Sequence, residues 1–369
     1  MSDFNLLKPE VKITVIFLLY SEQSYVRGLV EGILKQKHPR YSSQADWLKV
    51  VFVDNGSTDD TYGEIQRCFR DAGSPSNYEI FQIKKNEGIS RALNQVFQAT
   101  RTPYILTCHC DVMFGHDEYV YSMAQLMDET PNAGAIAGQP SIPQKQIPFA
   151  EKLNLVVNLM DIFPRGAGLF PVGFVEGRCE VFRIEALRKV GFYDTTLSHA
   201  GEDQILAAQM RAHGYELYQA CHLTYELSVS SDQDSVWKLV RHVRLFGRAH
   251  PYILFSRQKS RLGVFGATAG ENRQARAMLR VSQLACSVLY VFALGFLIIG
   301  QWLWVGVLLA IILGWKWQIF SRHILRVGFS VSEMLRFVAL QPILDFSYAF
   351  GFLHGLWLYL NPNRQKSIG

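Results

Sequence analysis

The stretch Val50-Val-Phe-Val-Asp-Asn-Gly-Ser-Thr-Asp-Asp-Thr61 decides the fold. Its first four residues are β-branched or aromatic, which favours a short central strand of a parallel sheet. Asp54 then follows at the carboxyl end of that strand, where open α/β sheets bind their ligands. The next residues are typical of a turn that leads into a helix cap: Asn55, Gly56, Ser57 and Asp59. Ordinary strand-to-helix turns have the same composition. The surrounding segments are therefore needed to decide whether these residues form only a turn or also a ligand site.

The surrounding sequence alternates strand and helix patterns. Apolar runs of strand length occupy residues 12–19, 79–83 and 104–108. Amphipathic helices are predicted at about 24–36 and 90–99, because apolar residues recur there at helical spacing. Repeated β-α units predict an α/β fold with a mostly parallel sheet covered by helices.

Three further motifs follow in a fixed order. Asn86-Glu-Gly-Ile-Ser90 precedes a helix, His109-Cys-Asp111 ends a strand, and Gly201-Glu-Asp203 begins another helix. Together with the first stretch they resemble the family 2 glycosyltransferases over about residues 10–230. The resemblance implies a GT-A fold and inversion at the anomeric carbon. The Glu-Asp pair and the arginine-rich segment after it are most similar to exopolysaccharide glycosyltransferases of the succinoglycan type, which act on lipid-linked sugars.

The resemblance also implies a divalent cation, Mn²⁺ or Mg²⁺, at the leaving diphosphate. The family has an Asp-X-Asp motif there, whereas this chain has His109, Cys110 and Asp111, so the first carboxylate is missing. Asp111 is the predicted metal ligand. His109 either binds the metal, hydrogen-bonds the ribose or phosphate, or is a packed histidine at a strand end. His222 follows a predicted strand at 215–220 and matches a position that supplies a third metal contact in relatives, so it is either a ligand or structural. Imidazole ligands favour manganese over magnesium.

Glycosyl transfer also needs a base for the acceptor hydroxyl. Asp203 matches the family's catalytic base, and Glu202 would shape the site or contact the acceptor. Acidic residues in a first helical turn can also serve the helix dipole alone. Asp54 matches the residue that binds the nucleotide base, usually uracil. The resemblance assigns nucleotide-loop and sugar-pocket positions to Asn86, Gly88, Arg91 and Gly177, where Gly88 either allows close backbone approach or is simply a turn glycine.

The chain changes character after about residue 230. Between Ser235 and Arg280 there are ten Lys or Arg residues and one acid, Glu271. Four of the basic residues recur at helical spacing: Lys238, Arg241, Arg244 and Arg248. This pattern predicts basic amphipathic helices over 231–280 at a membrane surface, where the same stripe could bind a diphosphate. The alternative is a solvated charged helix face.

A long apolar segment follows the basic one. Val281 to Phe320 contains one charged residue, Lys316, in 40 residues. A single helix of that length would measure about 60 Å, twice the hydrocarbon core, so we expect it to fold back near Gly300. Phe337 to Leu360 is a third candidate that either spans or is re-entrant. Residues 281–369 therefore form an all-α membrane region of two or three helices.

Basic residues on both sides of the apolar hairpin predict its orientation. By the positive-inside rule both flanks, and the catalytic domain at 1–230, are cytoplasmic. The protein is thus expected to be a multi-pass protein of the inner (plasma) membrane. A net charge of +5 among 369 residues is concentrated beside the apolar segments, which favours anionic lipid over nucleic acid.

The cysteines and the N-terminus agree with this location. Six cysteines show no framework spacing, which indicates free thiols in a reducing compartment. Cys108-His-Cys110 cannot wrap one zinc ion, and no second pair has finger spacing. The first apolar run has only the length of a strand, so no signal peptide is expected.

The sequence therefore predicts a membrane-anchored inverting glycosyltransferase. Its partners are a nucleotide-diphosphate sugar, in the first instance UDP-linked, and a lipid-linked saccharide acceptor in exopolysaccharide or cell-envelope glycan synthesis. No Gln-X-X-Arg-Trp motif of processive synthases is present, so one sugar per encounter is expected. Two alternatives remain: direct transfer to a polyprenyl phosphate, and an inactive nucleotide-binding membrane scaffold, which His109 in place of an acid would explain.

Overall fold

The chain forms two compact units. The computed structural model describes residues 12–142, 147–160, 162–163, 166–195, 201–227, 235–255 and 272–361. The first unit is Met1–Pro143 with Ile162–Ser228, and the second is Gln144–Asp161 with Val229–Gly369. Residues 144–161 thus group with the helical second unit, which the sequence did not reveal. An amphipathic segment between two strands looks the same whichever apolar surface it packs against.

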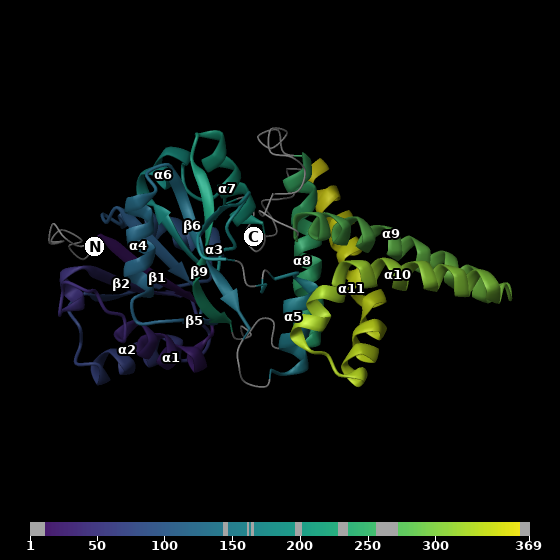
Figure 1. Cartoon of the computed structure of the whole chain (residues 1–369), viewed down its shortest axis with the longest axis horizontal. Helices are drawn as coiled ribbons and strands as arrows, with labels where there is room; N and C mark the ends of the chain where they lie inside the picture. The colour runs from purple at the N-terminus through teal and green to yellow at the C-terminus, as the bar shows by residue number, and fades with distance from the viewer. Residues whose placement is uncertain are drawn as a thin grey trace. The chain divides into compact units, whose positions relative to one another are not determined.

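The described part of the first unit contains one mixed β-sheet (Figure 1). Its strands are β1 (Ile13–Leu19), β2 (Leu48–Asn55), β3 (Tyr78–Ile83), β4 (Tyr104–Cys108), β5 (Val112–Phe114), β6 (Ala133–Ser141), β7 (Leu169–Pro171), β8 (Cys179–Arg183) and β9 (Glu216–Leu227). The order is β3-β2-β1-β4-β8-β6-β9-β5, and β7 pairs with β9. The predicted strands at 12–19, 79–83 and 104–108 are confirmed to within one residue.

The sheet combines a parallel half with a half that contains both parallel and antiparallel pairs. Strands β3, β2, β1 and β4 are all parallel, as the alternating β-α pattern predicts, and β6 is parallel to β9. Strand β8 runs antiparallel between β4 and β6, and β5 and β7 run antiparallel to β9. The carboxyl ends of β1, β2 and β4 therefore meet at one edge of the sheet.

Helices of the first unit pack on this sheet through apolar faces. They are α1 (Gln23–Leu34), α2 (Thr61–Asp71), α3 (Ile89–Ala99), α4 (Tyr119–Glu129), α6 (Ile184–Val190) and α7 (Glu202–Ala212). Phe97 of α3 lies against Phe182 of β8 and Tyr193, with ring centroids 6.2 and 5.8 Å apart. This cluster fixes α3, β8 and the segment before α7 around a shared core.

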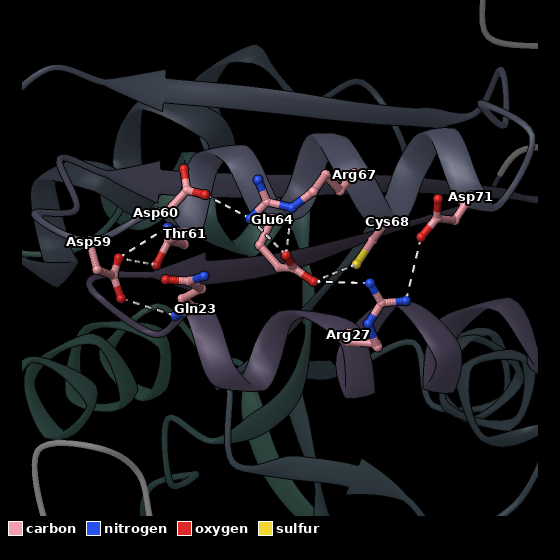
Figure 2. Close-up of polar contacts among 9 residues, drawn as sticks. All are labelled: Gln23, Arg27, Asp59, Asp60, Thr61, Glu64, Arg67, Cys68 and Asp71. Carbon is pink, nitrogen blue, oxygen red and sulfur yellow. Dashed lines mark hydrogen bonds and ion pairs between the residues drawn. The ribbon is translucent and has the colours of Figure 1, made fainter.

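Polar side chains hold the first turn of α2 against α1 (Figure 2). Asp59 accepts hydrogen bonds from the backbone N–H of Gln23 at 3.2 Å and from the N–H of Thr61 at 3.1 Å. The N-cap of α2 is Asp60, without a side-chain capping hydrogen bond, so Asp59 braces the turn ahead of the helix instead of capping it. Arg27 of α1 contacts Glu64 of α2 at 3.2 Å. These acids therefore have a structural role in the turn after β2. Other residues are the candidates for a site at the edge of the sheet.

The second unit is helical in its described residues. Its helices are α5 (Phe149–Val157), α8 (Val236–Phe255), α9 (Asn272–Ile298), α10 (Trp302–Val327) and α11 (Val331–Leu360). The predicted reversal near Gly300 is confirmed, because Gly300 has a φ of +73° between α9 and α10. Among the described residues, three segments are long and apolar enough to cross a membrane: 278–298, 302–327 and 331–360. Figure 1 shows α9 and α10 side by side as a hairpin.

Glycines bring α8 and α11 into backbone contact. A Cβ atom at Gly351 would clash with the carbonyl oxygen of Arg244, and one at Gly355 with that of Arg248. Ser347 of α11 donates a hydrogen bond to the carbonyl of Val240 at 2.9 Å. Small residues four apart allow such close helix packing in membranes and in water. The basic helix α8 is therefore fixed along α11 and exposes its charged side.

The one charged residue of the apolar segment has a partner. Lys316 of α10 lies 2.5 Å from Asp345 of α11, with side chains 4% and 1% exposed. Its Nζ also donates to the hydroxyl of Ser282 on α9 at 3.4 Å. This buried ion pair joins three helices of the unit.

Candidate functional site

The predicted donor and metal segments end β2 and β4, the two strands that flank β1. In the parallel register Asp54 of β2 lies opposite Leu19, the last residue of β1. Cys108, the last residue of β4, lies opposite Phe17 of β1. Asp54 and His109 therefore flank the carboxyl end of β1, as expected from the strand order.

Asp54 is almost completely buried and organises its own turn. It is 2% exposed. Its Oδ1 accepts a hydrogen bond from the N–H of Ser57 at 3.0 Å, and Oδ2 accepts one from Gln82 of β3 at 3.4 Å. The carboxylate thus has a definite structural role, and recognition of a nucleotide base by Asp54 stays a prediction.

Asn55 links this turn to the loop before α3. Its Oδ1 accepts from the N–H of Glu87 at 3.1 Å, and its Nδ2 donates to Asn86 Oδ1 at 3.2 Å. Asn86 in turn accepts from the N–H of Gly88 at 2.8 Å. Gly88 has a φ of +81°, which favours glycine, and Arg91 is exposed on α3. The sequence predicts only a turn role for Asn55. Its spacing from Asn86 gave no sign that the two side chains would hydrogen-bond.

Gly56 is the tightest point of the contact between these two loops. It has a φ of +72°, and a Cβ atom there would lie 2.5 Å from the backbone nitrogen of Asn86. We expect Gly56→Ala to lower the free energy of unfolding by more than about 1 kcal/mol, because strain and crowding add. Gly73→Ala is the matched control, since Gly73 has a φ of +77° with open space around it. Equal losses in denaturant unfolding would show that the loop contact is unimportant.

The predicted metal segment is tied to Arg178, a residue that we had not singled out. Arg178 Nη1 lies 2.5 Å from Asp111 Oδ2, and Asp111 is fully buried. The carbonyl of Arg178 also accepts a hydrogen bond from the N–H of His109 at 2.9 Å. A buried carboxylate needs a partner. Arg178 directly precedes β8, and its position in the sequence gave no signal for this pairing.

A small pocket brings together four of the predicted site residues. It is lined by Ile16, Leu18, Ile89, Leu93, Thr107, Cys108, His109, Gly177, Tyr193, Glu202 and Asp203. The predicted members, His109, Gly177, Glu202 and Asp203, come from three distant segments. Ile89 and Leu93 of α3 supply part of its apolar wall. Its lining combines an apolar wall with a few convergent polar groups, a combination that is common in ligand sites.

Glu202 and Asp203 occupy the first turn of α7 at this pocket. Gly201 precedes them with a φ of +82°. Burial raises the pKa of Glu202, and its Oε2 has no hydrogen-bond partner among the described residues. Asp203 Oδ1 accepts the N–H of Gln204 at 2.7 Å. Two adjacent carboxyl groups in different environments suit separate roles in acid-base chemistry.

The remaining predicted residues do not line this pocket: Asp54, Asn86, Gly88, Arg91, Asp111 and His222. His222 is exposed on β9, where the register with β6 shifts between the pairs of Ala220 and Thr224. Strand β9 continues to Leu227, beyond the end at Ala220 that we expected. In the described part of the chain no three His, Cys, Asp or Glu side chains form a metal site. A cation held by one carboxylate and substrate phosphates remains compatible with Asp111.

Comparisons with known proteins agree with this architecture. The glycosyl transferase family 2 model matches residues 14–191. A relative from Escherichia coli (strain K12), the uncharacterized glycosyltransferase YaiP, is 27% identical over 270 residues, which cover 68% of this chain and 62% of the relative. The chain therefore spans less than two thirds of that relative's length.

Two solved structures are similar to this chain, and the one with the higher TM-score extends the comparison to the fold. Mannosyltransferase PcManGT from Pyrobaculum calidifontis, in complex with GDP-Man and Mn²⁺, is 14% identical with a TM-score of 0.54, covering 94% of this chain and 87% of that chain. S. aureus TarS 1–349 with UDP-GlcNAc is 14% identical with a TM-score of 0.45, covering 95% and 92%. The first shows that the sheet unit has the predicted GT-A fold, followed by a helical region. Residues 14–191, with their strand-end motifs, thus form a domain that matches glycosyl transferase family 2.

Proposed function

We propose that the chain is a membrane-anchored inverting glycosyltransferase. It transfers a sugar from a nucleotide-diphosphate sugar, with UDP as the first nucleotide to test, to a lipid-linked saccharide in exopolysaccharide or cell-envelope glycan synthesis. The observation that carries the proposal is the pocket shared by His109, Gly177, Glu202 and Asp203. It lies in the unit that bears the family match and combines an acid pair with apolar walls. That combination suits binding of a sugar next to a base.

In this mechanism Asp203 takes the proton of the acceptor hydroxyl. The acceptor oxygen then forms a bond to the anomeric carbon, and the bond from that carbon to the diphosphate oxygen breaks. The electron pair leaves with the nucleoside diphosphate, so attack from the opposite face inverts the configuration. Gly177 lines the pocket without a side chain, and a Cβ there would approach Asp203 Cβ at 4.0 Å. This leaves the space beside the base to the sugar or the acceptor.

Asp111 and His109 are the proposed cation ligands. A divalent cation, Mn²⁺ or Mg²⁺, would supply positive charge to the leaving diphosphate. Asp111 would bind it through one carboxylate, and the contact with Arg178 would have to lengthen or be shared. His222, exposed on β9, is the least supported of the three predicted ligands. The Pyrobaculum structure was solved with GDP-Man and Mn²⁺, and we extend that class of ligand to this chain only as a proposal.

Asp111→Asn should weaken donor binding in the presence of Mn²⁺. The change removes the charge that would hold the cation, so we expect the Mn²⁺ dependence of nucleotide-sugar binding to be lost in calorimetric titrations. Asp117→Asn is the control, since Asp117 is an exposed acid paired with Lys37. Thermal unfolding must be measured in parallel because Asp111 also pairs with Arg178. An unchanged Mn²⁺ titration in a folded Asp111→Asn variant would remove Asp111 from this role.

The second unit is the proposed membrane anchor. Apolar side chains of α9 and α10 near their connection are exposed, among them Ile298, Leu303 and Trp302. Helix α8 exposes basic residues such as Arg241, and Arg244 lies 4.3 Å from the ring centroid of Phe350 on α11. Apolar hairpins with adjacent basic helices are typical of anchors at anionic membranes. A cytoplasmic catalytic unit at the inner membrane is part of this proposal.

An acceptor screen separates the proposed function from its closest rival. The purified protein, in detergent or lipid, would receive labelled UDP-sugars with either polyprenyl phosphate or saccharide-diphosphate lipids. Labelled product on the saccharide lipid alone supports the proposal, and product on polyprenyl phosphate alone supports direct transfer to the carrier. If the protein binds nucleotide but releases no sugar with any acceptor or with water in Mn²⁺, it is an inactive scaffold.

A further inference from the structure

Glu180 is a buried carboxyl group that the proposed mechanism does not use. It lies on β8 directly opposite Thr107 of β4 and is 1% exposed. Its Oε1 accepts a hydrogen bond from the hydroxyl of Thr107 at 2.6 Å. Its Oε2 has no hydrogen-bond partner among the described residues. Glutamate is rarely buried without a cationic partner, so this position requires an explanation.

Glu180 lies beside the proposed base. A Cβ atom at Gly177 would be 3.8 Å from Glu180 Oε1 and 4.0 Å from Asp203 Cβ, so both groups border the space over one glycine. Glu180 and Asp203 also line a second small pocket together with Tyr193. Asp203 and Tyr193 line the first pocket as well. Glu180 therefore forms the inner boundary of the site where the acceptor proton would be taken.

The surroundings of Glu180 favour its uncharged form. Burial raises its pKa well above the usual range, the Thr107 hydrogen bond opposes this, and Asp203 and Glu202 add to the rise. The titratable groups that face it belong to its own strand, to β4, β9 and α7, and to the segment before α7: Cys179, Cys108, Tyr225, Glu202, Asp203 and Tyr193. None of these groups is a cation. A neutral carboxyl group can donate as well as accept a hydrogen bond.

We propose that Glu180 is a positioning residue for Asp203, which supports the base from the inner side of the pocket without adding a second negative charge. The inference rests on the proposed function, because it needs Asp203 to be the base. An apolar side chain at this place would remove the 2.6 Å hydrogen bond of the Thr107 hydroxyl and leave it only the Glu180 carbonyl at 3.5 Å. A charged one would repel the Asp203 carboxylate that accepts the proton.

The first test measures stability against pH and does not depend on activity. The pKa of Glu180 is higher in the folded protein than its unfolded value of about 4.3. Wild-type stability should therefore fall as the pH rises above that value towards the folded pKa, because the unfolded chain releases the proton first. In Glu180→Gln this loss is absent. The difference in thermal midpoint, Glu180→Gln minus wild type, should therefore increase steadily from about pH 5 to pH 8. A constant difference would mean that Glu180 is charged when folded, and the proposal would fail.

The second test measures turnover. Glu180→Ala should lower kcat about tenfold or more with an unchanged KM for the donor, since displacement of a reacting group has this effect. Glu180→Gln, which keeps the hydrogen-bonding shape, should restore most of that loss. If Glu180→Ala does not fold, Thr107→Val takes its place and should lower kcat in the same way. Unchanged kcat per folded molecule would make Glu180 purely structural.

The two failures can be told apart. If Asp203→Asn keeps wild-type turnover, the proposed function fails at its base, and Glu180 has no base to position. If Asp203→Asn is inactive while the Glu180 variants turn over like wild type, only the role of Glu180 is lost.

Discussion

Asp203→Asn is expected to abolish sugar transfer while leaving nucleotide binding intact. The amide keeps the shape of the side chain but cannot accept the acceptor proton. General-base catalysis contributes about 10²- to 10⁴-fold, so kcat should fall by that amount. Release of nucleoside diphosphate in the presence of acceptor gives kcat, and calorimetric titration of the donor gives the binding constant.

The control for Asp203 is an acid at another helix start. Glu185 is exposed in the first turn of α6, where it can serve the helix dipole but does not line the pocket. Glu185→Gln and Asp203→Asn should both change stability by about 1 kcal/mol or less. Only Asp203→Asn should lose activity. If Asp203→Asn keeps its turnover, Asp203 is not the base and serves only to interact with the dipole of α7.

The buried pair of Lys316 and Asp345 should show strong coupling. Removing one partner leaves an uncompensated buried charge, so Lys316→Met or Asp345→Leu should each destabilise the second unit by about 3–5 kcal/mol. The double variant should be close to wild type or more stable, because apolar replacements of similar volume remove both desolvation costs. Unfolding in detergent micelles measures all three free energies.

A less buried pair in the same unit provides the comparison. Lys152 and Glu333 lie 2.9 Å apart with side chains 15% and 16% exposed. Lys152→Met with Glu333→Leu should show weaker coupling, because water screens these charges more effectively. If the losses from Lys316→Met and Asp345→Leu simply add in the double variant, the two residues do not act as a pair.

Most of the strand and helix positions followed from local patterns. The run 104–108 and the turn at Gly300 were predicted to within a residue, because apolar runs, glycine and helical spacing act over short distances. The end of β9 was predicted too early, since the strand continues past an irregularity in its pairing with β6. A bulge depends on the partner strand, which local sequence does not specify.

The sequence by itself determined the family motifs, the order of β-α units and the apolar hairpin, because each is written in a contiguous segment. It also singled out His109, Gly177, Glu202 and Asp203, which line one pocket. Only the tertiary structure decided which groups neighbour them. Arg178 against Asp111, Asn55 against the Asn86 loop and Glu180 beside Asp203 are contacts between distant segments. Such contacts arise from strand order and register. The burial of each side chain and its protonation state then depend on these neighbours, and the residue type alone does not determine them.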